Sequence, residues 1–236
     1  MKWRSLEEST PGADVRSLRE KLAGRKELIA KYVPAEIQAV HERVIADLAA
    51  GGILNHALGE GAKAPGFDLP DQNGKQTSLA SLLEHTKVVV FFLRGRWCPF
   101  CVGQLEAMNQ ALPQVRGAGA SIVAISPQTV QQAFFMADQH RVQFPLLSDA
   151  GNRVARAFGL AYQVPDEQQA IFRRAFINLP FTNGDESWEL PIPATFVIDR
   201  DATILYASSN PDYTQRPEPE DIVEALRKAG PSARQG

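Results

Sequence analysis

Two short apolar runs, each followed by a helical pattern, constrain the fold of this chain more than any other feature. Residues 87–93 read KVVVFFL, and residues 120–126 read ASIVAIS. Runs of this length without regular polar alternation suit strands that are buried on both faces. Helical patterns follow at 99–116 and 129–140. Strands that alternate with helices predict an α/β fold with a mainly parallel sheet covered on both sides.

Elements of another kind are expected at the two ends of this unit. Apolar residues at helical spacing predict two helices at 14–32 and 35–50, which form a hairpin. This hairpin packs either on the main domain or on a second copy of the chain, in which case the protein is a homodimer. ATFVID (194–199) and TILYAS (203–208) predict a final β-hairpin that gives the sheet an antiparallel edge, and a helix at 218–229 closes the chain.

This pattern divides the chain into an N-terminal helical extension at 1–58, a main domain at 59–230 and a tail at 231–236. The stretch from about 161 to 192 interrupts the alternation of strands and helices, so we interpret it as an insertion. An insertion of this length in a compact domain is either functional or a surface elaboration. Trp188 within it fits the mouth of a site or a packed anchor for the loop.

Charge and the N-terminal sequence exclude several classes of function. The chain carries 25 Lys and Arg against 27 Asp and Glu, a formal net charge of −2, and no run of basic residues. It therefore lacks the footprint of a nucleic-acid-binding protein. The first residues contain no apolar stretch of the length that a signal peptide or a membrane span needs. We expect a soluble, cytoplasmic protein without nucleic-acid or membrane partners.

Both cysteines of the chain lie at the first junction between a strand and a helix. In the cytoplasm, two cysteines this close together more often serve catalysis or bind a metal than form a permanent disulfide. Cys98 takes the N-cap position and Pro99 the first helical position, where its missing N–H costs nothing. Free amides and the helix dipole there, together with Arg94 and Arg96, are expected to lower the pKa of Cys98. We predict Cys98 as an exposed nucleophile and Cys101, one turn further on, as a buried resolving thiol.

The cysteine pair has two other interpretations, an inert pair in the core and a zinc site. Buried cysteines in protein cores are often inert. Zinc would need two further ligands, and the four histidines show no ligand spacing, so no metal or other cofactor is expected. Trp97, next to the pair, shields the thiolate, receives the surface of a partner protein, or simply packs. The four histidines are His41, His56, His85 and His140.

Several segments together resemble the peroxiredoxin family of alkyl hydroperoxide reductases and thiol-specific antioxidants, in the branch with a W-C-P-[FY]-C motif. They are GAKAPGFDLPDQNGKQTSLASLL, VVVFFLRGRWCPFC, ISPQTVQQAFFMADQHRVQFPLLSD, VARAFGL and PATFVIDRDATI. The resemblance covers about residues 60–229 and implies a thioredoxin-like fold. It further implies that Cys98 attacks a peroxide to become a sulfenic acid, that Cys101 condenses with it, and that a thioredoxin-type donor restores both thiols.

The sequence departs from this family at three positions. Peroxiredoxins carry Pro-x-x-x-Thr/Ser-x-x-Cys, and the places of the proline and the hydroxyl residue are Phe91 and Gly95 here. The family's arginine before the ATFVID-like strand is replaced by Pro193, which resembles the cis-proline of thioredoxin-type oxidoreductases. Either Arg94 or Arg96 would then have to supply the missing charge. Three functions stay open: a thiol peroxidase, a thiol–disulfide oxidoreductase acting on proteins, and a redox sensor that is not an enzyme.

Overall fold

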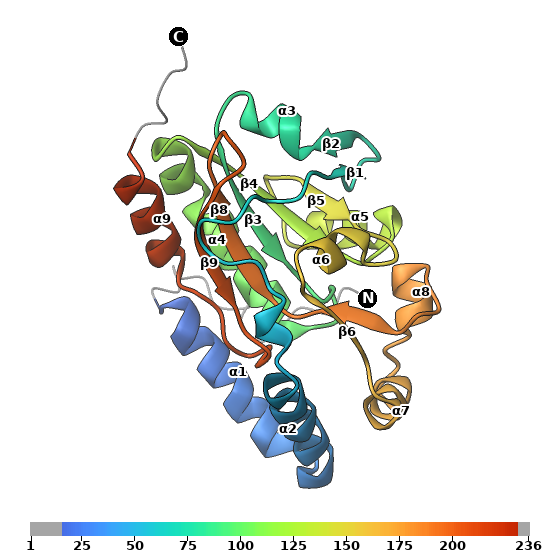
Figure 1. The fold of residues 1–236 in the computed structure, drawn as a ribbon. Coiled ribbons are helices and arrows are strands. Elements are labelled where there is room, and N and C mark those ends of the chain that lie inside the picture. The colour runs from blue at the N-terminus through green and yellow to red at the C-terminus, as the bar shows by residue number, and fades with distance from the viewer. Residues whose placement is uncertain (1–15, 231–236) are drawn as a thin grey trace.

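A computed structural model describes residues 16–230 (Figure 1). The tail predicted at 231–236, and the first two residues of the helix predicted at 14–32, lie outside the described residues. Within residues 16–230 the chain forms a five-stranded central sheet in the order β5-β4-β3-β8-β9. Its strands are β3 (Lys87–Phe92), β4 (Ala120–Ser126), β5 (Leu146–Ser148), β8 (Ala194–Ile198) and β9 (Ile204–Ser209).

The sheet is mixed rather than mainly parallel. β3, β4 and β5 pair in parallel, as expected for strands joined by the helices α4 (Pro99–Gly117) and α5 (Val130–Gln139). β8, however, pairs antiparallel with β3, and β9 antiparallel with β8. The short turn between β8 and β9 requires this last pairing and gives the antiparallel edge that was predicted.

β3 explains why its sequence is an unbroken apolar run. Successive side chains of a strand point to opposite faces. Val88 and Phe92 enter the core on one face, whereas Val89 and Phe91 enter the core on the other. All four side chains are completely buried, which explains the apolar run from Val88 to Phe92. Lys87, the first residue of the strand, is also buried, but its Nζ donates to the Gly230 carbonyl.

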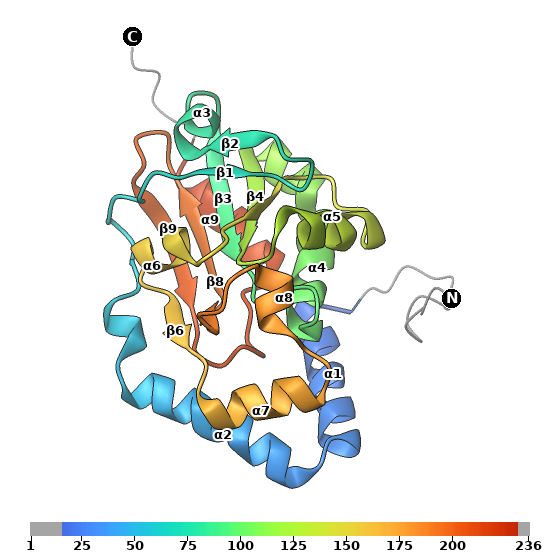
Figure 2. The same ribbon diagram turned by 90° about the vertical axis from the view of Figure 1, so that its right-hand side faces the viewer.

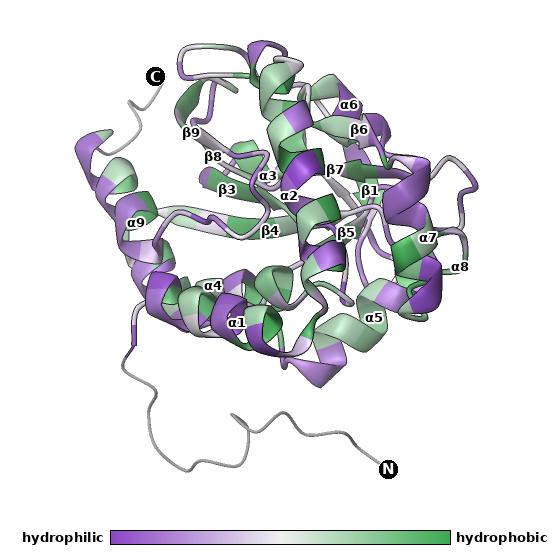
Figure 3. Cartoon of the chain, turned by 90° about the horizontal axis from the view of Figure 1, so that it is seen from below, coloured by the Kyte–Doolittle hydropathy of each residue, from purple (hydrophilic) through white to green (hydrophobic). Residues whose placement is uncertain are grey.

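Helices cover both faces of the sheet (Figures 1 and 2). On one face lie α4 and α9 (Pro219–Lys228), with α1 (Leu18–Tyr32) running along α4 (Figure 3). The Glu218 carboxylate accepts from the backbone N–H groups of Leu18 and Arg19 and thereby ties the first turn of α1 to the start of α9. The remaining helices are α2 (Ala35–Ala50), the short 3₁₀ turn η2 (Ile53–Asn55), α3 (Leu79–Leu83), α6 (Arg153–Ala157), α7 (Asp166–Arg174) and α8 (Leu179–Asn183).

The residues interpreted as an insertion form a separate segment outside the central sheet. It begins with β6 (Ala161–Gln163) and ends with β7 (Glu189–Pro191), which pair antiparallel and enclose α7 and α8. Figure 2 shows α7 lying along α2, and the two helices are in contact. The N-terminal hairpin therefore packs on this chain through both of its helices, α1 on α4 and α2 on α7. A further small hairpin consists of β1 (Asp68–Pro70) and β2 (Gln76–Ser78).

Candidate active site

The two cysteines lie where the sequence places them, at the start of α4. Cys98 is the N-cap residue with an extended backbone, and Pro99 occupies the first turn. The Pro99 carbonyl accepts a hydrogen bond from the Arg25 side chain of α1. The backbone N–H groups of Cys101 and Val102 donate to the Cys98 carbonyl, 3.1 Å away in both cases. Among the described residues, the Cys98 sulfur accepts no capping hydrogen bond from α4, so that part of the prediction is wrong.

Both thiols are free and buried. Cys98 is 1% exposed and Cys101 is completely enclosed, so the expectation of an exposed attacking thiol is also wrong. Burial by itself disfavours a thiolate. The charges that surround the pair decide whether a thiolate forms here.

Arg94 supplies one of these charges from the loop after β3. Its guanidinium is buried between aromatic rings, 4.1 Å from the Tyr213 ring centre and 4.9 Å from that of Trp97. Its backbone N–H donates to the Cys101 sulfur at 3.3 Å. The guanidinium atoms Nε and Nη2 have no hydrogen-bond partner within residues 16–230. Arg94 thus holds a permanent positive charge beside both thiols and keeps two donors unused.

Arg216 supplies a second charge that sequence reasoning missed. It lies in the loop between β9 and α9, and its Nη2 donates to the Cys101 sulfur at 3.7 Å. Its Nη1 donates to the carbonyls of Tyr213 and Gln215, which fixes the direction of the side chain. No motif surrounds Arg216 in the sequence, and 115 residues separate it from Cys101. Only the fold brings the two together.

These contacts reverse the predicted order of acidity. Burial acts to raise the pKa of Cys101, but a hydrogen bond from Cys98, the charges of Arg216 and Arg94, and the Arg94 amide lower it to about 5. Burial, reinforced by the hydrogen bond and charge of Cys101, raises the pKa of Cys98. The two thiols titrate as a pair, and the donors around them favour the thiolate at Cys101. The donors aim at Cys101 because the loop amide and Arg216 reach the first turn of α4, not its N-cap.

Comparison with known proteins identifies the family of this chain. The family model described as AhpC/TSA matches residues 61–207, a span that contains the cysteine pair, Arg94 and the whole central sheet up to β9.

The chain belongs to the AhpC/TSA family.

Its relatives include peroxiredoxins from plants and bacteria. Peroxiredoxin Q of wheat chloroplasts (Triticum aestivum) is 29% identical over 162 residues, 69% of this chain and 64% of the wheat protein's length. A candidate peroxiredoxin of Mycobacterium tuberculosis is 32% identical over 153 residues, 65% of this chain and 86% of that protein. The crystal structure of peroxidoxin BcpB from M. tuberculosis superimposes with a TM-score of 0.58 at 26% identity, covering 72% of this chain and 97% of the other. The peroxiredoxin-like fold of the thioredoxin type that the resemblance implied is confirmed.

Of the two arginines proposed to replace the family's missing charge, the structure brings Arg94 to the thiols. Arg96 is exposed, and its Nε donates to the Gln132 side chain of α5 at 2.7 Å. Its backbone N–H donates to Gln128 Oε1 at 2.6 Å. Arg96 therefore ties the active-site loop to α5, whereas Arg94 and Arg216 provide the charge.

Pro193 differs from the cis-proline that its position suggested. The Ile192–Pro193 peptide is trans, so the cis prediction is wrong. The Ile192 N–H donates to the Leu160 carbonyl at 2.9 Å, and β7 continues almost directly into β8. A trans peptide keeps this extended path unbroken. Pro193 lies buried before β8 and brings no charge to the site.

The N-terminal hairpin and the insertion together cover the site, a role that sequence reasoning did not assign to the hairpin. The ring of Phe172 on α7 lies 5.1 Å from that of Trp97 and 6.0 Å from the Arg94 guanidinium. His41 on α2 contacts the Phe172 ring at 5.9 Å and shares a 2.8 Å hydrogen bond with Gln168. Burial, and then the charge of Arg94, lower the pKa of His41 to about 4, so it is neutral near pH 7.

Other features lie apart from the thiols. Trp188 packs on the Arg173 guanidinium at 4.4 Å and anchors the insertion, as one of its two interpretations held.

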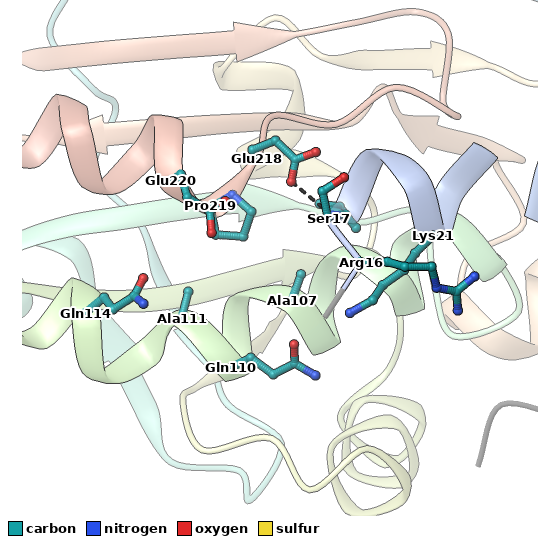
Figure 4. A pocket seen from close by; sticks show the side chains of 11 residues that line it. Arg16, Ser17, Lys21, Ala107, Gln110, Ala111, Gln114, Glu218, Pro219 and Glu220 are labelled. Atoms are coloured by element: carbon teal, nitrogen blue, oxygen red, sulfur yellow. Dashed lines mark hydrogen bonds between the residues drawn. The ribbon is translucent and has the colours of Figure 1, made fainter. Parts of the chain in front are cut away.

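A cavity of about 250 Å³ lies between α1, α4 and α9, with Ser17 and Glu218 in its lining but neither cysteine (Figure 4). Within the described ranges no cluster of three potential metal ligands occurs. None of the helices in residues 16–230 has the length and apolar character that crossing a membrane requires.

Proposed function

We propose that this protein reduces hydroperoxides with Cys98 as the attacking thiol and Cys101 as its base and resolving partner. Its relatives in the AhpC/TSA family are peroxiredoxins and support a thiol-dependent peroxidase oxidoreductase. The observation that carries the residue roles is the pair of buried free thiols beside two arginines, with the Arg94 amide and Arg216 Nη2 donating to the Cys101 sulfur.

Reaction begins with transfer of the Cys98 proton to the Cys101 thiolate along the hydrogen bond that joins them. The Cys98 thiolate then attacks one oxygen of the hydroperoxide. A sulfur–oxygen bond forms, the oxygen–oxygen bond breaks, and the departing alkoxide takes the proton held by Cys101 and leaves as the alcohol. Both arginines stabilise negative charge wherever it lies on the pair, because each acts on both sulfurs.

The second step closes a disulfide. The Cys101 thiolate attacks the sulfur of the Cys98 sulfenic acid, and hydroxide leaves and is protonated by solvent to water. A dithiol of the thioredoxin type then reduces the disulfide and becomes oxidised itself. We favour Cys98 as the attacking residue because it is the N-cap residue of α4, between the half-buried Trp97 and the exposed Pro99, whereas Cys101 lies one turn inside the helix.

The competing activity, thiol–disulfide exchange with folded proteins, receives less support. The cis-proline on which it rested is a trans-proline, and both sulfurs are buried. A disulfide in a folded protein brings the surrounding backbone with it and needs an open surface at the attacking sulfur. A small hydroperoxide does not need such a surface. The homodimer and the location in the cytoplasm stay predictions, and several plant relatives are named as chloroplast proteins.

A trapping experiment tests the residue roles. In Cys101→Ser, hydrogen peroxide in the presence of dimedone is expected to leave a dimedone adduct on Cys98, since no thiol remains to condense with the sulfenic acid. Cys98→Ser is the matched control and should give no adduct. An adduct on Cys101 in the control, with none on Cys98 in the first variant, would reverse the two roles. Peroxide-dependent NADPH oxidation with thioredoxin and its reductase tests the donor.

A further inference from the structure

Trp97 has an unusual combination of an accessible ring and an inaccessible polar atom. The side chain is half-buried and packs against Arg94 and Phe172. Its indole Nε1 is completely buried, and the part of the chain that the structure describes offers it no acceptor. A buried indole N–H normally has a hydrogen-bond partner. Without one, the group loses its hydrogen bond to water on burial and gains none in return. An acceptor at this place would therefore be bound favourably.

Gly95 shows where this N–H lies. Its φ is 143°, and a Cβ added to it would come 2.7 Å from the Trp97 Nε1 and 3.0 Å from Cδ1. The indole nitrogen thus fills the space that a side chain at position 95 would take, three residues before Cys98. Glycine at this position is what lets the N–H approach the backbone of the active-site loop.

Further unused donors lie around the same loop. Arg94 keeps Nε and Nη2 without partners among residues 16–230, and its guanidinium is 4.9 Å from the Trp97 ring centre. Gln128, whose Oε1 would lie 3.2 Å from a Cβ at Gly95, accepts from the Arg96 N–H, and its buried Nε2 is likewise unpartnered in this range. Four N–H-bearing atoms without acceptors among residues 16–230 therefore belong to side chains in and around the loop that leads to Cys98. They fit a ligand that carries oxygen acceptors and no bulky donor group.

We propose that the Trp97 indole N–H is a catalytic hydrogen-bond donor that holds the hydroperoxide oxygen beside Cys98, with Arg94 as the second donor. This inference rests on the proposed peroxidase function. When the Cys98 thiolate attacks, negative charge develops on the departing oxygen. A fixed N–H in a site shielded from water stabilises that charge without reorganisation. The indole N–H thereby serves attack on peroxide and contributes nothing to ordinary alkylation of the thiols.

Trp97→Phe tests the proposal, because it keeps an aromatic ring against Arg94 and Phe172 and removes the N–H. Reduced protein is mixed with hydrogen peroxide, quenched with N-ethylmaleimide and analysed by mass spectrometry for remaining thiols. The variant should lose about 10- to 100-fold in the second-order rate, the range expected for one donor to a developing oxyanion. Its rate of alkylation by iodoacetamide should stay within about twofold of the wild type, since that reaction depends on the thiolate alone. Trp188→Phe, the same change in the insertion, should alter neither rate.

Three outcomes separate the possibilities. An unchanged peroxide rate in Trp97→Phe overturns the donor role. Equal losses in the peroxide and alkylation rates also overturn it, because they indicate that the ring only positions the thiols. Failure of the wild type to react with peroxide at all would refute the proposed function itself, whatever the variant does.

Discussion

Replacing Arg216 with glutamine tests the electrostatic account of the thiol pair most directly. The change removes the guanidinium whose Nη2 lies 3.7 Å from the Cys101 sulfur and leaves a neutral side chain of similar polarity. Arg94 remains in place, so the variant isolates the contribution of the residue that sequence reasoning missed. Loss of a nearby cation makes a thiolate less favourable, and the apparent pKa of the pair must rise.

The size of the rise follows from the distance. Two unit charges 3.7 Å apart attract by about 4.5 kcal/mol at an effective dielectric constant of ~20 and by about 1.1 kcal/mol at ~80. At 1.36 kcal/mol per pKa unit, these limits correspond to about 3 and about 1. Because Arg216 is only partly buried, the result should lie between them. The pKa of about 5 for Cys101 should therefore rise to about 6–8 in the variant.

Alkylation as a function of pH measures this directly. Reduced protein is treated briefly with iodoacetamide, and mass spectrometry gives the fraction modified at each cysteine. The wild type should react increasingly as the pH rises through about 5, and Arg216→Gln only at higher pH. Arg227→Gln on the exposed face of α9 removes the same charge away from the thiols and should behave as the wild type. Identical midpoints for Arg216→Gln and the wild type would refute the argument that this guanidinium stabilises the thiolate.

Two further predictions concern the cover of the site and the N-terminal helix. Phe172→Ala should raise the rate at which a bulky maleimide labels the cysteines, because the Phe172 ring packs on Trp97. Phe176→Ala, at a side chain on the same segment that is 97% exposed, should leave this rate unchanged. Equal labelling rates in the two variants would exclude α7 as a barrier. Glu218→Ala should lower the free energy of unfolding by about 1.5–3 kcal/mol in urea titrations, since two amides of α1 lose a charged acceptor, and an unchanged midpoint would mean that water replaces the carboxylate without cost.

The local sequence determines where the chemistry lies. A strand whose side chains enter a core on both faces is mostly apolar, so β3 can be predicted from the run at residues 88–93. A proline in the first turn and two cysteines one turn apart then mark the start of α4, because each signal acts over a few residues. The N-terminal hairpin follows in the same way from apolar residues at helical spacing.

Tertiary structure decides which groups act on the thiols. Arg216 reaches Cys101 across 115 residues, and His41 meets Gln168 across 127. No local pattern encodes either contact, because each depends on how the loop after β9 and the helices α2 and α7 pack over the end of the sheet. A helix N-cap by itself predicts an acidic Cys98. In the fold, the Arg94 amide and Arg216 Nη2 both donate to the Cys101 sulfur, and the pKa is lowered at Cys101 and raised at Cys98.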